Sequence, residues 1–234
     1  MKLHKLYFFF APGAMAVLLA TSSLVSELQS ARDRQDRTAL DQVINRLKMH
    51  ATPAGTPDMQ YQLALAYSYA AELSMEQRDK KKAEDYAEAG MDAAKKAVDS
   101  RPDDAEYHRL LGDLCGQVIP ANPIFGGMKY GQCARDEVNK ALQLDPNLAL
   151  AYVSRGVGNY YLPESFGGGV DLALKDFDKA IALNPKLSDA YVWKGIALRK
   201  VKKNSEARQA LAQAVQLSPD WEWAKEQLQK TPAQ

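Results

Sequence analysis

Apolar residues recur at spacings of three and four along most of the chain, which is the period of an amphipathic helix. The clearest such stripe, near the C-terminus, consists of Ala207, Leu211, Ala214 and Leu217. A helix with one apolar stripe must bury it against a neighbour, so we expect successive helices to pack as antiparallel pairs. No stretch alternates apolar and polar positions as a strand does, and the pattern therefore predicts an all-α fold.

Four stretches of the chain end alike, in a helical apolar pattern closed by proline. They lie at 97–102, 141–146, 180–185 and 214–219. Proline fixes its own φ and disfavours helical geometry in the residue before it, so a helix has to stop at each of these points. The regular recurrence of this ending predicts a repeat architecture.

The best copy of the repeat, residues 188–219, carries small and aromatic residues at fixed places on two helices. They are Tyr191, Gly195, Leu198, Ala207, Leu211, Ala214 and Pro219. This pattern resembles the tetratricopeptide repeat (TPR) family, and the resemblance extends over residues 57–219. It implies a right-handed solenoid of antiparallel helix pairs.

The resemblance also divides the chain into segments. We expect a capping helix and loop at 23–56, with the helix itself at 36–48. Four TPR-like repeats are expected across 57–219, and a C-terminal capping helix and tail at 220–234. The repeats are expected at 57–102, 105–146, 149–185 and 188–219.

The first 22 residues differ from the rest. A basic start at Lys2 and Lys5 precedes the apolar run 6–20, and this layout is typical of a secretory signal peptide. The run is shorter than the roughly 20 apolar residues that span a bilayer, which favours cleavage over retention as an inner-membrane anchor. We expect export to a bacterial periplasm, with membrane contact only through residues 1–22 if they are retained.

TPR arrays generally hold a peptide or helix of a partner protein in a concave groove lined by the first helix of each pair. The resemblance therefore implies that partner binding falls to the solvent-facing positions of these helices. They are Tyr61, Leu65, Tyr69, Arg109, Asp113, Gln117, Val153, Val157, Tyr160, Tyr161, Val192, Ile196, Arg199 and Lys200. The apolar members indicate either an exposed binding patch or a surface covered by a further helix or by the N-terminal segment.

A Pro and Phe-Gly-Gly segment occurs twice, at 123–127 and 163–169, and each copy is expected to form a loop ahead of a second helix. Its candidate residues are Phe125, Gly126, Gly127, Phe166, Gly167, Gly168 and Gly169. Consecutive glycines can present N–H groups to an anion, or they can permit a tight turn while the two phenylalanines enter the core. We favour the turn because no Lys or Ser/Thr follows in the phosphate-loop pattern.

Cys115 and Cys133 are the two cysteines of the chain. The first is expected on one helix of a hairpin and the second at the start of the next, so an oxidising compartment would allow a disulfide between them. The alternative is a pair of separate small core residues.

Composition limits the classes of function. A formal net charge of +1 gives no electrostatic footprint for nucleic acid. Three histidines without paired ligands offer neither a metal site nor a nucleophile and base set, so we expect no metal, no cofactor and no enzyme activity.

The leading hypothesis is a protein-binding scaffold. The alternative is a periplasmic small-ligand-binding subunit of a solute-transport system, in which Tyr160, Tyr161 and the Gly-rich loops shape a pocket.

Overall fold

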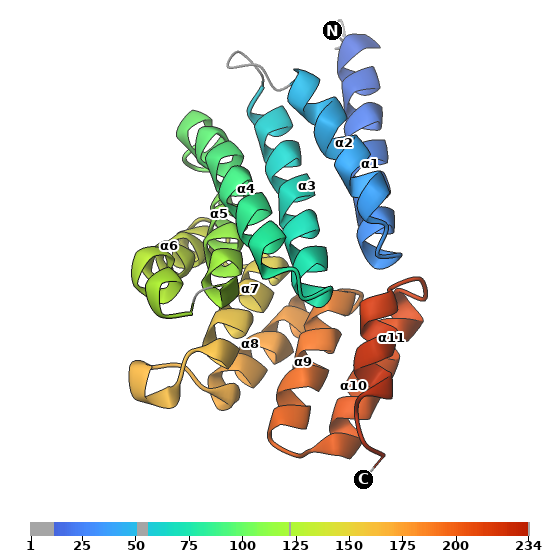
Figure 1. The fold of residues 1–234 in the computed structure, drawn as a ribbon, viewed down its shortest axis with the longest axis vertical. Coiled ribbons are helices and arrows are strands. Elements are labelled where there is room, and N and C mark those ends of the chain that lie inside the picture. The colour runs from blue at the N-terminus through green and yellow to red at the C-terminus, as the bar shows by residue number, and fades with distance from the viewer. Residues whose placement is uncertain (1–11, 51–55, 122, 234) are drawn as a thin grey trace, which may run out of the picture.

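The computed structural model describes residues 12–50, 56–121 and 123–233. Within this part of the chain every regular element is helical, with eleven α-helices and two short 3-10 turns. Neighbouring α-helices lie side by side in pairs along a curved array (Figure 1). The expected all-α solenoid of antiparallel pairs is confirmed.

The α-helices follow one another along the chain with short connections. In chain order they are α1 (Pro12–Asp33), α2 (Arg37–His50), α3 (Pro57–Glu76), α4 (Lys80–Ser100), α5 (Ala105–Val118), α6 (Pro123–Leu144), α7 (Ala149–Tyr161), α8 (Val170–Leu183), α9 (Ser188–Lys200), α10 (Asn204–Leu217) and α11 (Glu222–Gln229), with the 3-10 turns η1 (Ile119–Ala121) and η2 (Glu164–Phe166).

Local sequence explains most helix ends. The helices α4, α6, α8 and α10 each stop just before the prolines at 102, 146, 185 and 219, as the pattern predicts. At the other end, Thr56 accepts a hydrogen bond from the Met59 amide ahead of α3. Asp104 does the same for two amides of α5. These side chains satisfy amides that have no partner inside the helix.

Among the residues that the structure describes, the buried apolar side chains form three clusters. The largest joins α1 to α5 and includes Leu28, Leu40, Leu73 and Leu114. A second lies around Phe177 on α8, and the third joins α9 and α10 to α11. Each pair of helices therefore buries its stripe against the next pair, as expected for a solenoid.

The N-terminal pair is larger than the sequence suggested. The stretch 23–33, for which we predicted no helix of its own, continues α1, which packs against α2 through Leu28 and Ala31. The expected helix at 36–48 corresponds to α2. Residues 1–11 of the predicted export segment lie outside the described residues. None of the helices that the structure describes is both long and apolar enough to cross a bilayer.

The first Gly-rich segment is helical, so the expected loop at 123–127 is wrong. Residues 123–127 form the beginning of α6, and Cys133 consequently lies in the middle of that helix. A Cβ added to Gly126 would come within 3.0 Å of the Ile119 Cα. The glycine thus lets α6 begin directly against the η1 turn.

Candidate partner-binding groove

The first-helix residues of α3 fall on one side of that helix. Tyr61 and Tyr69 are half-buried there. Leu65 is buried in the large core cluster, so the prediction that it faces solvent is wrong. Two glutamates continue the same side of α3. Glu72 lies three residues after Tyr69, and Glu76 lies four residues after Glu72. Sequence reasoning stopped at Tyr69 and missed both, although the helical spacing could have included them.

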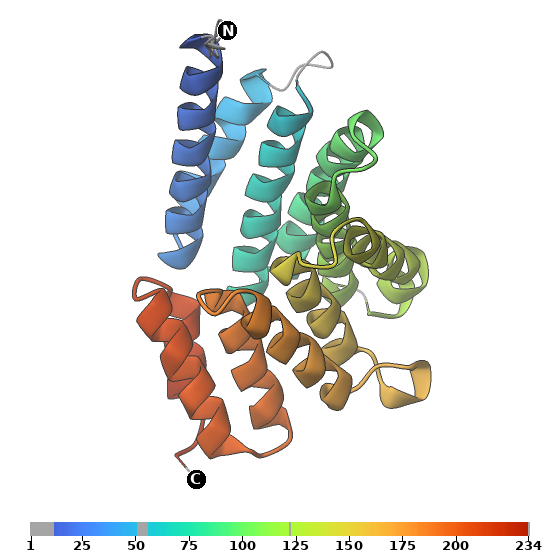
Figure 2. The same cartoon turned by 180° about the vertical axis from the view of Figure 1, so that it is seen from behind.

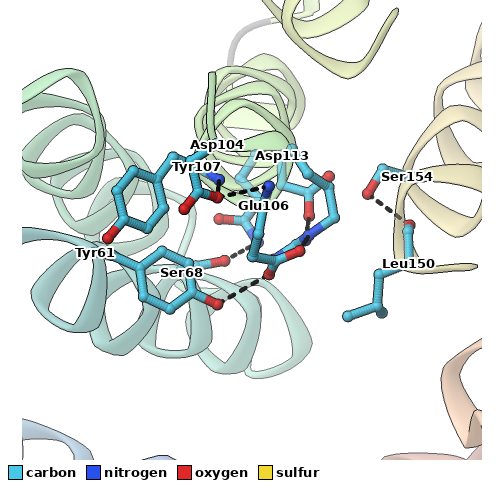
Figure 3. Close-up of polar contacts among 10 residues, drawn as sticks. Tyr61, Ser68, Asp104, Glu106, Tyr107, Asp113, Leu150 and Ser154 are labelled. Carbon is cyan, nitrogen blue, oxygen red and sulfur yellow. Dashed lines mark hydrogen bonds and ion pairs between the residues drawn. The ribbon is translucent and has the colours of Figure 1, made fainter. Parts of the chain in front are cut away.

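On α5, the predicted residues form a network with α3. Arg109 is only 6% exposed and its guanidinium bonds to both Glu106 and Asp113. Tyr61 donates its hydroxyl to Glu106 Oε1 at 2.9 Å, and its ring stacks on Tyr107 at 5.2 Å between centroids (Figure 3). Arg109 is therefore held by carboxylates of its own helix and is buried, so the prediction that it faces open solvent is wrong.

Asp113 and Gln117 follow Arg109 on the same side of α5. Gln117 donates from Nε2 to Ser68 Oγ at 3.0 Å, while its Oε1 is shielded from solvent and accepts no hydrogen bond. Burial raises the pKa of Asp113, and the neighbouring Arg109 only partly opposes this effect. Removal from water thus disfavours the ionised carboxylate.

Arg32, at the end of α1, was missed by sequence reasoning. Its Nη1 donates to Asp189 Oδ1 of α9 at 3.0 Å. Its guanidinium also lies 5.0 Å from the ring centroid of Tyr69 and 4.4 Å from that of Trp221. Both ribbon views show the end of α1 meeting the C-terminal helices (Figures 1 and 2). One buried side chain therefore joins α1, α3, α9 and the start of α11.

We call the surface to which these helices contribute the inner face. It consists of Arg32, Tyr61, Tyr69, Glu72, Arg109, Asp113 and Asp189.

Two pKa values on α3 reflect the surroundings of the inner face. Burial raises the pKa of Glu72 to about 7, aided by the charges of Asp189, Asp33 and Asp113 and opposed by Arg32. Burial, with the charge of Glu72, raises the pKa of Glu76 to about 8, although Gln35 donates to its carboxylate at 2.9 Å. This face is thus rich in carboxyl groups that are partly removed from water and that disfavour one another's ionisation.

The apolar positions of α7 and α9 do not form an open patch. Val192 is 0% exposed, and it packs with Ile196 against Trp221 and Ala224. Val153 is buried in the cluster around Phe177. The prediction that these three residues face solvent is wrong because α8, α9 and α11 cover them. An additional helix covers part of this surface, which is one of the two alternatives that the pattern left open.

The charged positions at the end of α9 are engaged by neighbouring elements. Arg199 donates from Nη2 to Gln227 Oε1 at 2.7 Å and from Nη1 to Thr231 Oγ1 at 3.1 Å, which ties α9 to the C-terminal segment. Lys200 donates to the Tyr160 carbonyl at 2.9 Å, and its Nζ lies 4.1 Å from the Tyr160 ring centroid.

A depression of about 520 Å³ lies beside the second Gly-rich loop. Its lining includes Tyr160, Tyr161, Gly169 and Lys200. Tyr160 and Tyr161 contact each other edge to face at 5.0 Å, and Tyr161 is 64% exposed. The structure therefore brings the two tyrosines next to the second Gly-rich loop.

The loop itself follows the expected turn in one respect and departs from it in another. Gly167 and Gly169 have φ values of 85° and 114°, which a side chain would strain. Phe166, however, is 76% exposed, so the expectation that it enters the core is wrong. Val170, which follows the loop at the start of α8, is the residue that is buried in the cluster around Phe177.

The two cysteines can form a disulfide. Their Cα atoms are 6.0 Å apart and the structure joins their sulfurs. Cys115 is buried in the large core cluster and Cys133 packs against it, so the disulfide would connect α5 to the middle of α6 within the core.

Paired antiparallel helices with small residues at their contacts and a concave inner side define the class of TPR solenoid proteins. Residues 177–209 match a tetratricopeptide repeat family. Residues 23–164, more than half of the chain, match the family described as regulator of microtubule dynamics protein 1-3. The chain belongs to this family.

A curated relative supports the same family. Regulator of microtubule dynamics protein 3 of Bos taurus is 28% identical over 130 residues, which is 56% of this chain. The match spans 26% of that relative, about a quarter of its length, so the role in its name remains a statement about the bovine protein.

Two solved structures share the fold. The HusA haemophore from Porphyromonas gingivalis matches with a TM-score of 0.59 and 18% identity, over 90% of this chain and 96% of its own. A thermophilic TPR protein of Thermus thermophilus matches with a TM-score of 0.56 and 16% identity, over 92% of this chain and 93% of its own. TPR proteins are generally non-enzymatic scaffolds that bind proteins or peptides.

Proposed function

We propose that this protein is a non-enzymatic scaffold that holds a peptide or helix of a partner protein against its inner face. The supporting observation is the convergence of aromatic rings and charged groups from α1, α3, α5 and α9 on one face. Partner surfaces of proteins are enriched in tyrosine and arginine, which are both present here.

The partner would lie along α3 and α5. Tyr61 and Tyr69 are half-buried, so each has one part of its ring fixed by neighbours and another part open. Rings held in this way lose little conformational freedom when a partner binds. The buried valines of α7 and α9 are excluded from the contact surface because other helices already cover them.

Site-specific photocrosslinking in cells tests this proposal. A benzophenone amino acid is placed at Tyr69 on the inner face, and a matched one at Lys175, an exposed position of α8. We expect a crosslinked partner from position 69 and none from position 175. Crosslinks from position 175 alone would overturn the proposed binding face.

We also propose that the scaffold acts in the bacterial cell envelope. The basic and apolar beginning of the sequence and the disulfide-capable cysteine pair support export to an oxidising compartment. A C-terminal alkaline phosphatase fusion, which folds to an active enzyme only outside the cytoplasm, should be active. Activity of the matched β-galactosidase fusion instead would contradict export.

A second function is supported by the depression at Tyr160 and Tyr161. Its volume of about 520 Å³ is within the range of small-molecule sites, and two aromatic rings and Lys200 line it. A ligand-binding subunit would retain a small molecule through gentle purification. Native mass spectrometry of the full chain and of a Tyr161→Ala variant checks this; a retained mass that the variant loses favours the ligand function over the scaffold.

A further inference from the structure

The inner face carries more negative than positive groups. Six carboxylates lie on it or at its edge, and we call them the inner carboxylates. They are Asp33, Glu72, Glu76, Glu106, Asp113 and Asp189. Two guanidiniums, those of Arg32 and Arg109, lie among them.

Both guanidiniums are already shared between two carboxylates. Arg32 bonds to Asp33 and Asp189, and Arg109 bonds to Glu106 and Asp113. Each arginine can neutralise one negative charge. Even when Glu72 and Glu76 hold their protons, the other four carboxylates outnumber the two guanidiniums, so the set keeps a negative surplus. An additional cation at this face would therefore be attracted, and an anion would be repelled.

Glu72 lies among several of these charged groups. Within the described part of the chain its carboxylate makes no hydrogen bond and no ion pair closer than 4.0 Å. Its electrostatic surroundings combine one cation, Arg32, with three carboxylates, those of Asp189, Asp33 and Asp113. The side chain of Glu72 is half-buried, so its carboxylate is partly removed from water, has no bonded cation and is still open to a ligand.

Aromatic rings and an unused acceptor accompany this carboxylate. Tyr69, one turn before Glu72, already takes the guanidinium of Arg32 on its ring at 5.0 Å. Gln117 Oε1, also on the side of α5 that carries Asp113, has no donor. Carboxylates, tyrosine rings and free acceptors are together the groups that recognise lysine and arginine side chains.

We infer that the partner segment is basic, and that one of its lysine or arginine side chains binds Glu72 between α3, α5 and α9. This inference rests on the proposed function and specifies the chemistry of the partner. An acidic segment would meet the surplus charge of the inner carboxylates and is disfavoured.

The test is fluorescence anisotropy with the full-length chain and three labelled peptides of about 12 residues. Their alanine-rich sequences are identical except that four positions carry lysine, glutamine or glutamate. We expect saturable binding of the lysine peptide alone, weakened by added salt because screening reduces the attraction. Equal binding of all three peptides would overturn the inference, and so would binding of none.

Variants locate the contact. Glu72→Gln should weaken binding of the lysine peptide by about tenfold, the scale of one charge-assisted hydrogen bond. The control Asp85→Asn removes an exposed carboxylate of α4 and should leave binding unchanged. If both variants bind as the wild type does, Glu72 is not the contact. Glu72→Lys, checked by circular dichroism for folding, should abolish binding of the lysine peptide.

The result also separates this inference from the proposed function. If crosslinking at Tyr69 captures a partner whose crosslinked segment has no lysine or arginine, the scaffold function stands and the basic partner is wrong. If position 69 captures nothing and no peptide binds, both are wrong.

Discussion

At the scale of single residues, the distance between paired helices is set by glycine. Gly156 of α7 faces the Phe177 ring of α8, and a Cβ added there would lie 2.5 Å from Phe177 Cε1. Gly195 of α9 faces Leu211 of α10 in the same way, and a Cβ added at Gly195 would lie 2.5 Å from Leu211 Cγ. One hydrogen atom in place of a methyl group therefore lets the two backbones approach.

Two glycines of α7 give a direct comparison. We expect Gly156→Ala to lower the free energy of unfolding by about 1–3 kcal/mol, because the new methyl group overpacks the contact with Phe177. Gly158→Ala meets nothing within 4 Å, and it should raise stability by about 0.5–1 kcal/mol through helix propensity. Urea unfolding measures both; equal midpoints for the two variants would contradict this packing.

Glu72 should make stability depend on pH. Its pKa is about 7 in the folded protein, against an ordinary value of 4.5. Below pH 4.5 Glu72 holds its proton in both the folded and the unfolded protein, so its contribution to stability is fully present. As pH rises toward 7 the unfolded chain loses the proton first, which lowers stability.

Glu72→Gln stays neutral at every pH and removes that loss. We expect its melting temperature to be close to that of the wild type at pH 5 and higher at pH 8, by about 2–4 °C, the shift that about 1 kcal/mol produces at this chain length. Differential scanning calorimetry at the two pH values measures it. A difference that does not grow with pH would show that Glu72 ionises normally.

At the scale of helices, the pair α5 and α6 differs from the two pairs that follow it. Its second helix begins directly after η1 and is 22 residues long, whereas α8 and α10 each have 14. Cys115, near the end of α5, is joined to Cys133 in the middle of α6. A covalent link there would limit separation of the two helices in the unfolded chain.

Reduction should therefore weaken the protein. The sequence separation of 18 residues implies that the link stabilises the fold by about 3 kcal/mol. We expect dithiothreitol to lower the melting temperature of the exported wild type and to leave a Cys115→Ala/Cys133→Ala variant unchanged. Intact mass with and without reduction tells whether the bond forms, and a mass that reduction does not change would contradict it.

At the scale of the whole molecule, Arg32 brings the two ends of the array together. It pairs with Asp189, which lies 157 residues away in sequence, and it stacks on the buried Trp221 at the start of α11. Loss of a buried ion-pair partner costs more than loss of an exposed one, since the remaining charge stays out of water.

We expect Arg32→Gln to loosen the α1 and α2 pair from the C-terminal helices. Electron paramagnetic resonance between nitroxide residues at the exposed positions 34 and 222 should give a broader distance distribution. The control Arg46→Gln removes an exposed pair with Glu27 and should leave the distribution narrow. Equal distributions in the two variants would contradict a closing role for Arg32.

The candidate groove could be predicted only in part. The spacing on α3 and α5 selected Tyr61, Tyr69, Arg109 and Asp113, because a helix carries such residues on one side whatever its neighbours are. The same reasoning predicted that Val192 faces solvent. In the structure it is buried, because Trp221 covers it. It could not find Arg32, because nothing near that residue in the sequence indicates that α1 ends against α9.

The sequence by itself determined the features that depend on local spacing: the helical period, the proline stops, the glycine contacts and, through them, the TPR architecture. Only the tertiary structure decided which residues face the inside of the array, which segments cover the apolar positions, and where negative charge accumulates. The physical reason is that burial and electrostatic fields arise from helices far apart in the chain. Their packing brings Arg32, Glu72, Asp113 and Asp189 together although no local pattern relates them.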